Sequence, residues 1–174
     1  ATDWRGNNNI AESILGQLRR EPQPVPTWIV CGVGTGGTSA TIGRYLRYRR
    51  LDTRLCVAEP TGSSYVHGWR TRDRNAVASQ PTRIEGIGRP KVEPGFLFDV
   101  VDDVVEVDDA AAIAGALQLE SLFGTQYGGS SGVNLIGCLQ LASAMRARGE
   151  TGSIVSLLCD RGKRYQETLF DPAW

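Results

Sequence analysis

The chain has 174 residues, of which 41% are hydrophobic and 22% charged, and its formal net charge is zero. This is enough apolar material for one folded core and too much for a disordered segment. A neutral chain lacks the positive charge that nucleic-acid or anionic-membrane binding needs, and no apolar run approaches the ~18 residues of a membrane helix. We therefore expect a single unit over residues 1–174 that binds neither nucleic acid nor membrane.

Four cysteines are spread along the sequence without a C-x-x-C pair, at Cys31, Cys56, Cys138 and Cys159. Three of them stand in apolar, strand-like stretches. This pattern predicts buried free thiols and no metal site. Free thiols are typical of a reducing compartment, so we expect a cytoplasmic protein.

Helical and strand-like segments alternate in the first half of the chain. Asn9, with Glu12 three residues later, predicts a capped helix that runs to about residue 20. The continuous apolar run at 28–31 predicts a buried parallel strand, which leads through a glycine-rich stretch into a helix ending near residue 49. A second strand is expected at 55–58.

The stretch 61–90 shows no periodicity, and we expect a loop there. Loops this long inside compact domains are usually functional or mobile. It contains the single histidine, His67, for which a surface position is expected. The remaining predicted elements are a strand at 104–107, a helix from the cap Asp108 to about 123, a helix after 128–132, and a strand at 154–158. This alternation predicts an α/β fold, a mostly parallel sheet with helices on both faces.

The strongest site signal is the loop Gly32-Val33-Gly34-Thr35-Gly36-Gly37-Thr38, between the first strand and its helix. Backbone N–H groups and the helix dipole favour an anion at a helix N-terminus. Glycines let a phosphate approach the backbone, and the threonines add hydroxyl donors. The loop therefore predicts a phosphate site, and the alternative is a tight turn that binds nothing.

The residues alone leave the kind of phosphate ligand open. Gly32, Gly34 and Gly37 match the dinucleotide fingerprint, and Glu59 ends the next strand, where a ribose-binding acid would stand. That predicts an NAD(P)-binding Rossmann-type module. It leaves the second glycine loop, at 128–132, without a role. A compact phosphorylated ligand would use both loops and meet the Ser130 hydroxyl at its far end, unless Ser130 is only a helix cap.

Five motifs, in order, resemble the C-terminal part of the fold type II pyridoxal-phosphate enzymes, the cysteine synthase and cystathionine β-synthase family. They are Gly34-Thr35-Gly36-Gly37-Thr38, Val57-Ala58-Glu59-Pro60, Ile84-Glu85-Gly86-Ile87-Gly88, Gly128-Gly129-Ser130-Ser131-Gly132 and Leu158-Cys159-Asp160-Arg161-Gly162-Lys163-Arg164-Tyr165. The segments 5–14 and 42–45 are closest to actinobacterial L-cysteine desulfhydrase-like members. The resemblance implies most of the large domain of the tryptophan synthase β-like fold.

The resemblance also implies roles for residues of this chain. Gly34, Thr35, Gly36, Gly37 and Thr38 would bind the phosphate of pyridoxal 5'-phosphate, and Ser130 would hydrogen-bond its pyridine nitrogen. The cofactor and the substrate entrance would lie beside Gly86 and Gly88, and the ring would lie beside Cys159 and Asp160. The motif Asp160-Arg161-Gly162-Lys163 departs from the family's aspartate-serine-glycine-glutamate pattern, which affects this last edge.

The lysine that forms the Schiff base with the cofactor lies, in this family, in a part that precedes everything present here. Lys91 and Lys163 are outside the family's lysine motif and stand in contexts typical of solvated side chains. We therefore expect no catalytic residue in this chain, and we expect the N-terminal segment and the small domain to come from a complementary N-terminal polypeptide. The family implies a homodimer of the complete unit.

The implied reaction is β-elimination or β-replacement on a small amino acid, cysteine or an O-activated serine. Two alternatives to this pyridoxal-phosphate lyase or transferase remain at this point. One is the NAD(P)-binding module, which requires Glu59 at a ribose. The other is a catalytically inert scaffold subunit, which predicts no turnover with any partner.

Overall fold

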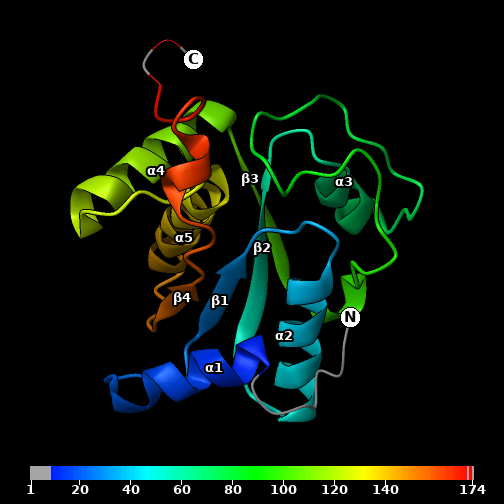
Figure 1. The fold of residues 1–174 in the computed structure, drawn as a ribbon. Helices are drawn as coiled ribbons and strands as arrows, with labels where there is room; N and C mark the ends of the chain where they lie inside the picture. Colours follow the sequence, from blue (N-terminus) through cyan, green and yellow to red (C-terminus); the bar gives the residue numbers. More distant parts are fainter. Residues whose placement is uncertain (1–8, 172, 174) are drawn as a thin grey trace.

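A computed structural model describes residues 9–171 and 173. Its centre is a parallel sheet in the order β3-β2-β1-β4, which confirms the predicted α/β class (Figure 1). The strands are β1 (Trp28–Cys31), β2 (Arg54–Pro60), β3 (Asp103–Val107) and β4 (Ile154–Ser156). In the register, Val30 of β1 lies between Cys56 of β2 and Ser156 of β4.

Helices cover both faces of the sheet, as predicted (Figure 1). One face carries α1 (Ile10–Gln17), α2 (Gly37–Tyr48) and α3 (Ser64–Thr71), and the other carries α4 (Asp109–Phe123) and α5 (Gly129–Ala147). Short 3-10 turns lie at Leu18–Arg20, Phe98–Val100 and Gly162–Tyr165. Alternate residues of a strand point to opposite faces, so Ile29 packs in one core cluster while Val30 packs in the other.

The caps predicted from the sequence are present. Asn9 accepts a hydrogen bond from the Glu12 amide at 3.0 Å, and Asp108 accepts from the amides of Ala110 and Ala111 at the start of α4. Within the described ranges, no helix combines the length and apolarity that crossing a membrane would require.

Four predictions about local structure were wrong, and the first concerns 128–132, where the expected loop is the first turn of a helix that begins at Gly129. The stretch 61–90 contains α3, which aperiodic sequence concealed, because Tyr65 and Val66 are buried beside polar or small neighbours. The last strand ends at Ser156 and not at residue 158, because the chain leaves the sheet edge there to line a cavity. Of the four free thiols, Cys138 is half-buried and Cys159 is exposed.

The order of the strands determines where loops can meet. β1 pairs with β2 on one side and with β4 on the other, and the helix after β1 covers the opposite face from the helix before β4. The connections therefore diverge between β1 and β4. In open parallel sheets the crevice for a ligand lies at such a point, beyond the carboxyl ends of the strands.

Candidate functional site

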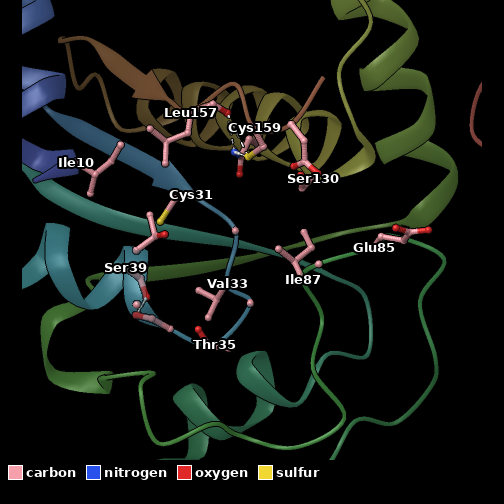
Figure 2. A pocket seen from close by; sticks show the side chains of 18 of the residues that line it. Ile10, Cys31, Val33, Thr35, Ser39, Glu85, Ile87, Ser130, Leu157 and Cys159 are labelled. Carbon is pink, nitrogen blue, oxygen red and sulfur yellow. Dashed lines mark hydrogen bonds between the residues drawn. The ribbon is translucent and has the colours of Figure 1, made fainter. Parts of the chain in front are cut away.

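A cavity of about 700 Å³ opens beyond the ends of β1 and β4. Its walls come from the start of α2, the start of α5, the loop around Gly86 and the segment after β4. Figure 2 shows Thr35 and Ser39 along one wall and Ser130 and Cys159 along the opposite one. Nine of the ten residues placed beside the cofactor by the resemblance line this cavity, Gly88 being the exception: Gly34, Thr35, Gly36, Gly37, Thr38, Gly86, Ser130, Cys159 and Asp160.

Two glycines of the first loop are required by close packing. Gly36 has φ +90°, and a Cβ there would overlap the Gly95 carbonyl carbon and the Phe96 nitrogen. A Cβ on Gly34 would lie 2.6 Å from the Gly86 carbonyl oxygen. Because these contacts are to backbone atoms, neither position can accept a side chain without moving the main chain.

Gly37 differs from its neighbours because it borders open space. A Cβ at Gly37 would meet no heavy atom within 4 Å, and the residue lines the cavity. It is the first residue of α2, where backbone N–H groups have no intrahelical acceptor. The exposed Thr35 and Thr38 border the same space. This cradle of amides and hydroxyls therefore fits a phosphate group.

The carboxyl group of Glu59 joins the two loops on this side of the cavity. It is fully buried and accepts hydrogen bonds from the Val33 amide at 2.5 Å, the Ser63 hydroxyl at 2.9 Å and the Gly88 amide at 3.2 Å. Burial raises the pKa of Glu59 to about 8, although these hydrogen bonds act in the opposite direction. All these partners belong to the protein, so Glu59 fixes the loops and is not exposed to a ligand.

The buried side chain of Tyr65 holds the glycine loop by a hydrogen bond. Its hydroxyl donates a hydrogen bond to the Gly34 carbonyl oxygen. Its ring is fully buried against Phe96, with ring centroids 4.6 Å apart. The backbone nitrogen of Phe96 is also one of the atoms that leave no room for a Cβ on Gly36, so this buried segment lies close to both tightly packed glycines.

At the opposite wall, two neighbouring serines have different environments. Ser131 is 1% exposed, and its Oγ accepts a hydrogen bond from the Cys159 amide at 2.8 Å. Ser130 lines the cavity, and within the described part of the chain its hydroxyl makes no hydrogen bond. The Gly128 amide also donates to the Asp160 carbonyl oxygen at 2.9 Å. The segment after β4 therefore fixes the start of α5 and leaves the Ser130 hydroxyl available.

The edge where the sequence departs from the family pattern is held by polar contacts. Asp160 accepts a hydrogen bond from the Tyr165 hydroxyl at 2.9 Å and lies 3.4 Å from Arg164. Arg164 also lies 3.7 Å from Glu85, across the cavity rim. Burial raises the pKa of Tyr165 to about 12, and the hydrogen bond with Asp160 acts in the same direction. Asp160 is therefore already committed to two partners.

Sequence reasoning missed several residues of the cavity wall. Asn134, on α5, donates to the Leu157 carbonyl oxygen at 2.9 Å, and its buried Oδ1 has no partner in the described part of the chain. Arg89 and Cys31 also line the cavity. Chiefly through burial, the pKa of the Cys31 thiol rises to about 12, so it stays protonated. Their spacing in sequence carries no signal, because folding alone brings these residues together.

Other expected residues lie away from the cavity. Gly88 packs against Pro60 and Thr82 and does not line it. His67 is exposed, as predicted, but on α3. Lys91 and Lys163 are both exposed, and neither lines the cavity. Within the described ranges, no group of three or more His, Cys, Asp or Glu side chains could hold a metal ion.

Comparison with known proteins agrees with this geometry. Residues 1–160 match the family described as PALP, pyridoxal-phosphate dependent enzyme. This chain belongs to that family. The match confirms the resemblance drawn from the five motifs and displaces the NAD(P)-binding alternative.

Three relatives within the family show how far the similarity extends. The chain is 53% identical over 174 residues to L-cysteine desulfhydrase Cds1 of Mycobacterium tuberculosis, covering 100% of this chain and 47% of that protein. It is 33% identical to cysteine synthase 2 of Schizosaccharomyces pombe, and the match covers 82% of this chain and 38% of that protein. A hydrogen sulfide-producing enzyme of Fusobacterium nucleatum matches in structure with TM-score 0.77 and 30% identity. This match covers 94% of this chain and 46% of that enzyme. The chain thus spans about half the length of these relatives or less.

Proposed function

We propose that this chain is the part of a pyridoxal-phosphate dependent lyase or transferase that holds the phosphate and the ring nitrogen of the cofactor. The substrates are cysteine or an O-activated serine, and the reaction is β-elimination or β-replacement. The observation that carries the proposal is the cavity, which has an anion cradle at Gly37 on one wall and the free hydroxyl of Ser130 on the other.

The two walls have distinct roles. The amides of Gly34–Thr38 and the hydroxyls of Thr35 and Thr38 receive the phosphate, and Ser130 donates to or accepts from the ring nitrogen. A serine there does not hold that nitrogen protonated as a carboxylate would, which suits reactions at the β-carbon. When bound, pyridoxal phosphate supplies the electron sink that lets an amino acid lose its α-proton and then its β-substituent.

The substrate class is supported by the names of the relatives. Both an L-cysteine desulfhydrase and a cysteine synthase match over most of this chain. Desulfhydrase and synthase share the loss of the β-substituent and differ in whether water or a new nucleophile completes the reaction. The choice between them belongs to the complete protein.

The lysine of the reaction comes from a complementary N-terminal part of the enzyme. Lys91 and Lys163 are both exposed and outside the cavity wall, and the relatives extend well beyond the length of this chain. That part also completes the small domain, and the complete unit forms a homodimer in the cytoplasm.

The test is a visible absorption spectrum of the complete protein after pyridoxal phosphate is added and the excess removed by gel filtration. A retained band that borohydride bleaches is expected, with the reduced adduct mapping to a lysine N-terminal to this chain. The double variant Lys91→Arg, Lys163→Arg should retain the band. Loss of the band in that variant would place the lysine in this chain, and tight NADH binding without a band would overturn the proposal. A retained band without turnover of cysteine or O-acetylserine would indicate an inert scaffold.

A further inference from the structure

Arg89 stands out in the cavity wall because its side chain has no bonded partner among the described residues. Within residues 9–171 and 173, it takes part in no hydrogen bond or ion pair, and its Nε is buried without a partner. A guanidinium group carries five N–H donors. The one on Nε is buried without an acceptor, which costs free energy, and the terminal nitrogens are left to bind a ligand that this cavity receives.

The guanidinium group of Arg89 lies close to the glycine loop. One terminal nitrogen lies 3.9 Å from the point where Gly34 would carry a Cβ. The backbone at Arg89 is also held in place, because its carbonyl oxygen accepts a hydrogen bond from the Ser64 amide at 3.3 Å and the preceding Gly88 is bound to Glu59. Arg89 thus places a cation beside the predicted phosphate cradle, from a backbone position that is held on both sides.

The other charges near this wall are paired or neutralised. Arg164 lines the same cavity but is paired with Asp160 and Glu85. The glycine loop itself offers only neutral amides and hydroxyls. Glu59 is a buried acid behind the same loop, and with its pKa raised to about 8 it stays largely protonated near neutral pH and does not cancel the charge of Arg89.

We propose that Arg89 binds an oxyanion that rests on the glycine loop. The inference rests on the proposed function, which supplies two oxyanions, the phosphate of the cofactor and the carboxylate of the amino-acid substrate. The phosphate is the first expectation, because the guanidinium group lies beside Gly34 and a doubly charged group gains most from a bidentate cation.

The test compares Arg89→Gln and Arg89→Lys in the complete protein. Equilibrium affinities are measured for pyridoxal phosphate and for pyridoxal, which lacks the phosphate, and KM and kcat are measured for cysteine. Arg70→Gln is the matched control, because it removes the same charge from an exposed ion pair with Glu106, outside the cavity. Unchanged pyridoxal affinity in Arg89→Gln shows that the cavity is still folded.

If Arg89 binds the phosphate, Arg89→Gln weakens pyridoxal phosphate binding by about tenfold or more and leaves pyridoxal binding unchanged. Arg89→Lys retains part of the affinity. If Arg89 binds the substrate carboxylate, both cofactor affinities stay constant while KM rises by about tenfold with little change in kcat. Either result supports an oxyanion site.

Equal weakening of both cofactor affinities would show a packing role and overturn the inference, as would unchanged values in every assay. Failure of the proposed function is visible separately, since the wild-type protein would then retain no pyridoxal phosphate. In that case inorganic phosphate replaces the cofactor, and its stabilisation of the wild-type protein against heat should be lost in Arg89→Gln. Equal stabilisation of both proteins would overturn the oxyanion site.

Discussion

The two walls of the cavity are held in place by different means. The glycine loop rests on fully buried groups, the carboxyl of Glu59 and the ring of Tyr65, and its glycines pack against backbone. The wall that carries Ser130 depends on the segment after β4, whose Asp160 and Arg164 are exposed. The supports of the first wall are therefore part of the core, whereas the buried Ser131 of the second wall is bonded to a segment whose side chains lie at the surface.

The two walls also differ in how closely they follow the family motif. A side chain at Gly34 or Gly36 would overlap the backbone of Gly86, Gly95 or Phe96, and the family motif is complete in this loop. The contacts of Asp160 with Tyr165 and Arg164 tolerate a different set of neighbours, and the motif at 160–163 departs from the family pattern. We expect substitutions at the first wall to cost more stability than those at the second.

Gly36 and Gly37 give the sharpest test of the first wall. Gly36→Ala should lower the free energy of unfolding by roughly 3 kcal/mol or more, because it combines left-handed backbone strain with a clash against Gly95 and Phe96. Gly37→Ala should leave stability equal or slightly higher, since alanine favours a helix and its methyl group enters open space. Urea unfolding of both variants measures the difference.

The same pair separates stability from binding. Gly37→Ala places a methyl group in the phosphate cradle, so we expect its affinity for pyridoxal phosphate to fall although it folds normally. The affinity is measured by titration of the cofactor band. Normal affinity in a folded Gly37→Ala protein would show that the phosphate lies elsewhere.

Glu59 tests whether one buried carboxyl holds the first wall together. Glu59→Ala leaves the Val33 and Gly88 amides without their acceptor in a buried site, which should cost about 2 kcal/mol. Glu59→Gln keeps the shape and mimics the protonated carboxyl group, so it should cost less. Urea unfolding at constant pH measures both.

The pH dependence of stability follows from the pKa of about 8 in the folded protein. The unfolded chain releases this proton near the ordinary glutamate value, about 4.3. Between these values the folded state binds more protons, so the Glu59 contribution makes the free energy of unfolding decrease as pH rises from about 5 to about 8. Glu59→Gln should lack this decrease. Parallel curves for the two proteins would show that Glu59 has an ordinary pKa.

The sequence was sufficient to predict the elements with strong local signals. The apolar run at 28–31 became β1, and the caps Asn9 and Asp108 were found at the starts of α1 and α4. Local sequence patterns did not predict the elements whose conformation depends on tertiary packing. α3 is preceded and started by serines and contains Gly68, which must be glycine because a Cβ would lie 2.8 Å from the Asp73 carbonyl oxygen.

The site shows the same limit. Motifs marked the residues whose backbone conformation is special, such as Gly36, and these line the cavity. They did not mark Arg89 or Asn134, because an arginine in a loop and an asparagine in a helix have no local pattern that reports what they face. The exposure of Cys159 likewise depends on where β4 ends.

Ser130 and Ser131 give the smallest effects and the finest test of the second wall. Ser131→Ala removes the acceptor of the Cys159 amide and should cost about 1 kcal/mol of stability. Ser130→Ala should cost less than about 0.5 kcal/mol, because no hydrogen bond within the described chain depends on its hydroxyl. The cofactor should respond in the opposite order, with the visible band shifting in Ser130→Ala and not in Ser131→Ala. A band that shifts only in Ser131→Ala would show that Ser131, and not Ser130, contacts the cofactor ring. It would also mean that this wall rearranges when the cofactor binds.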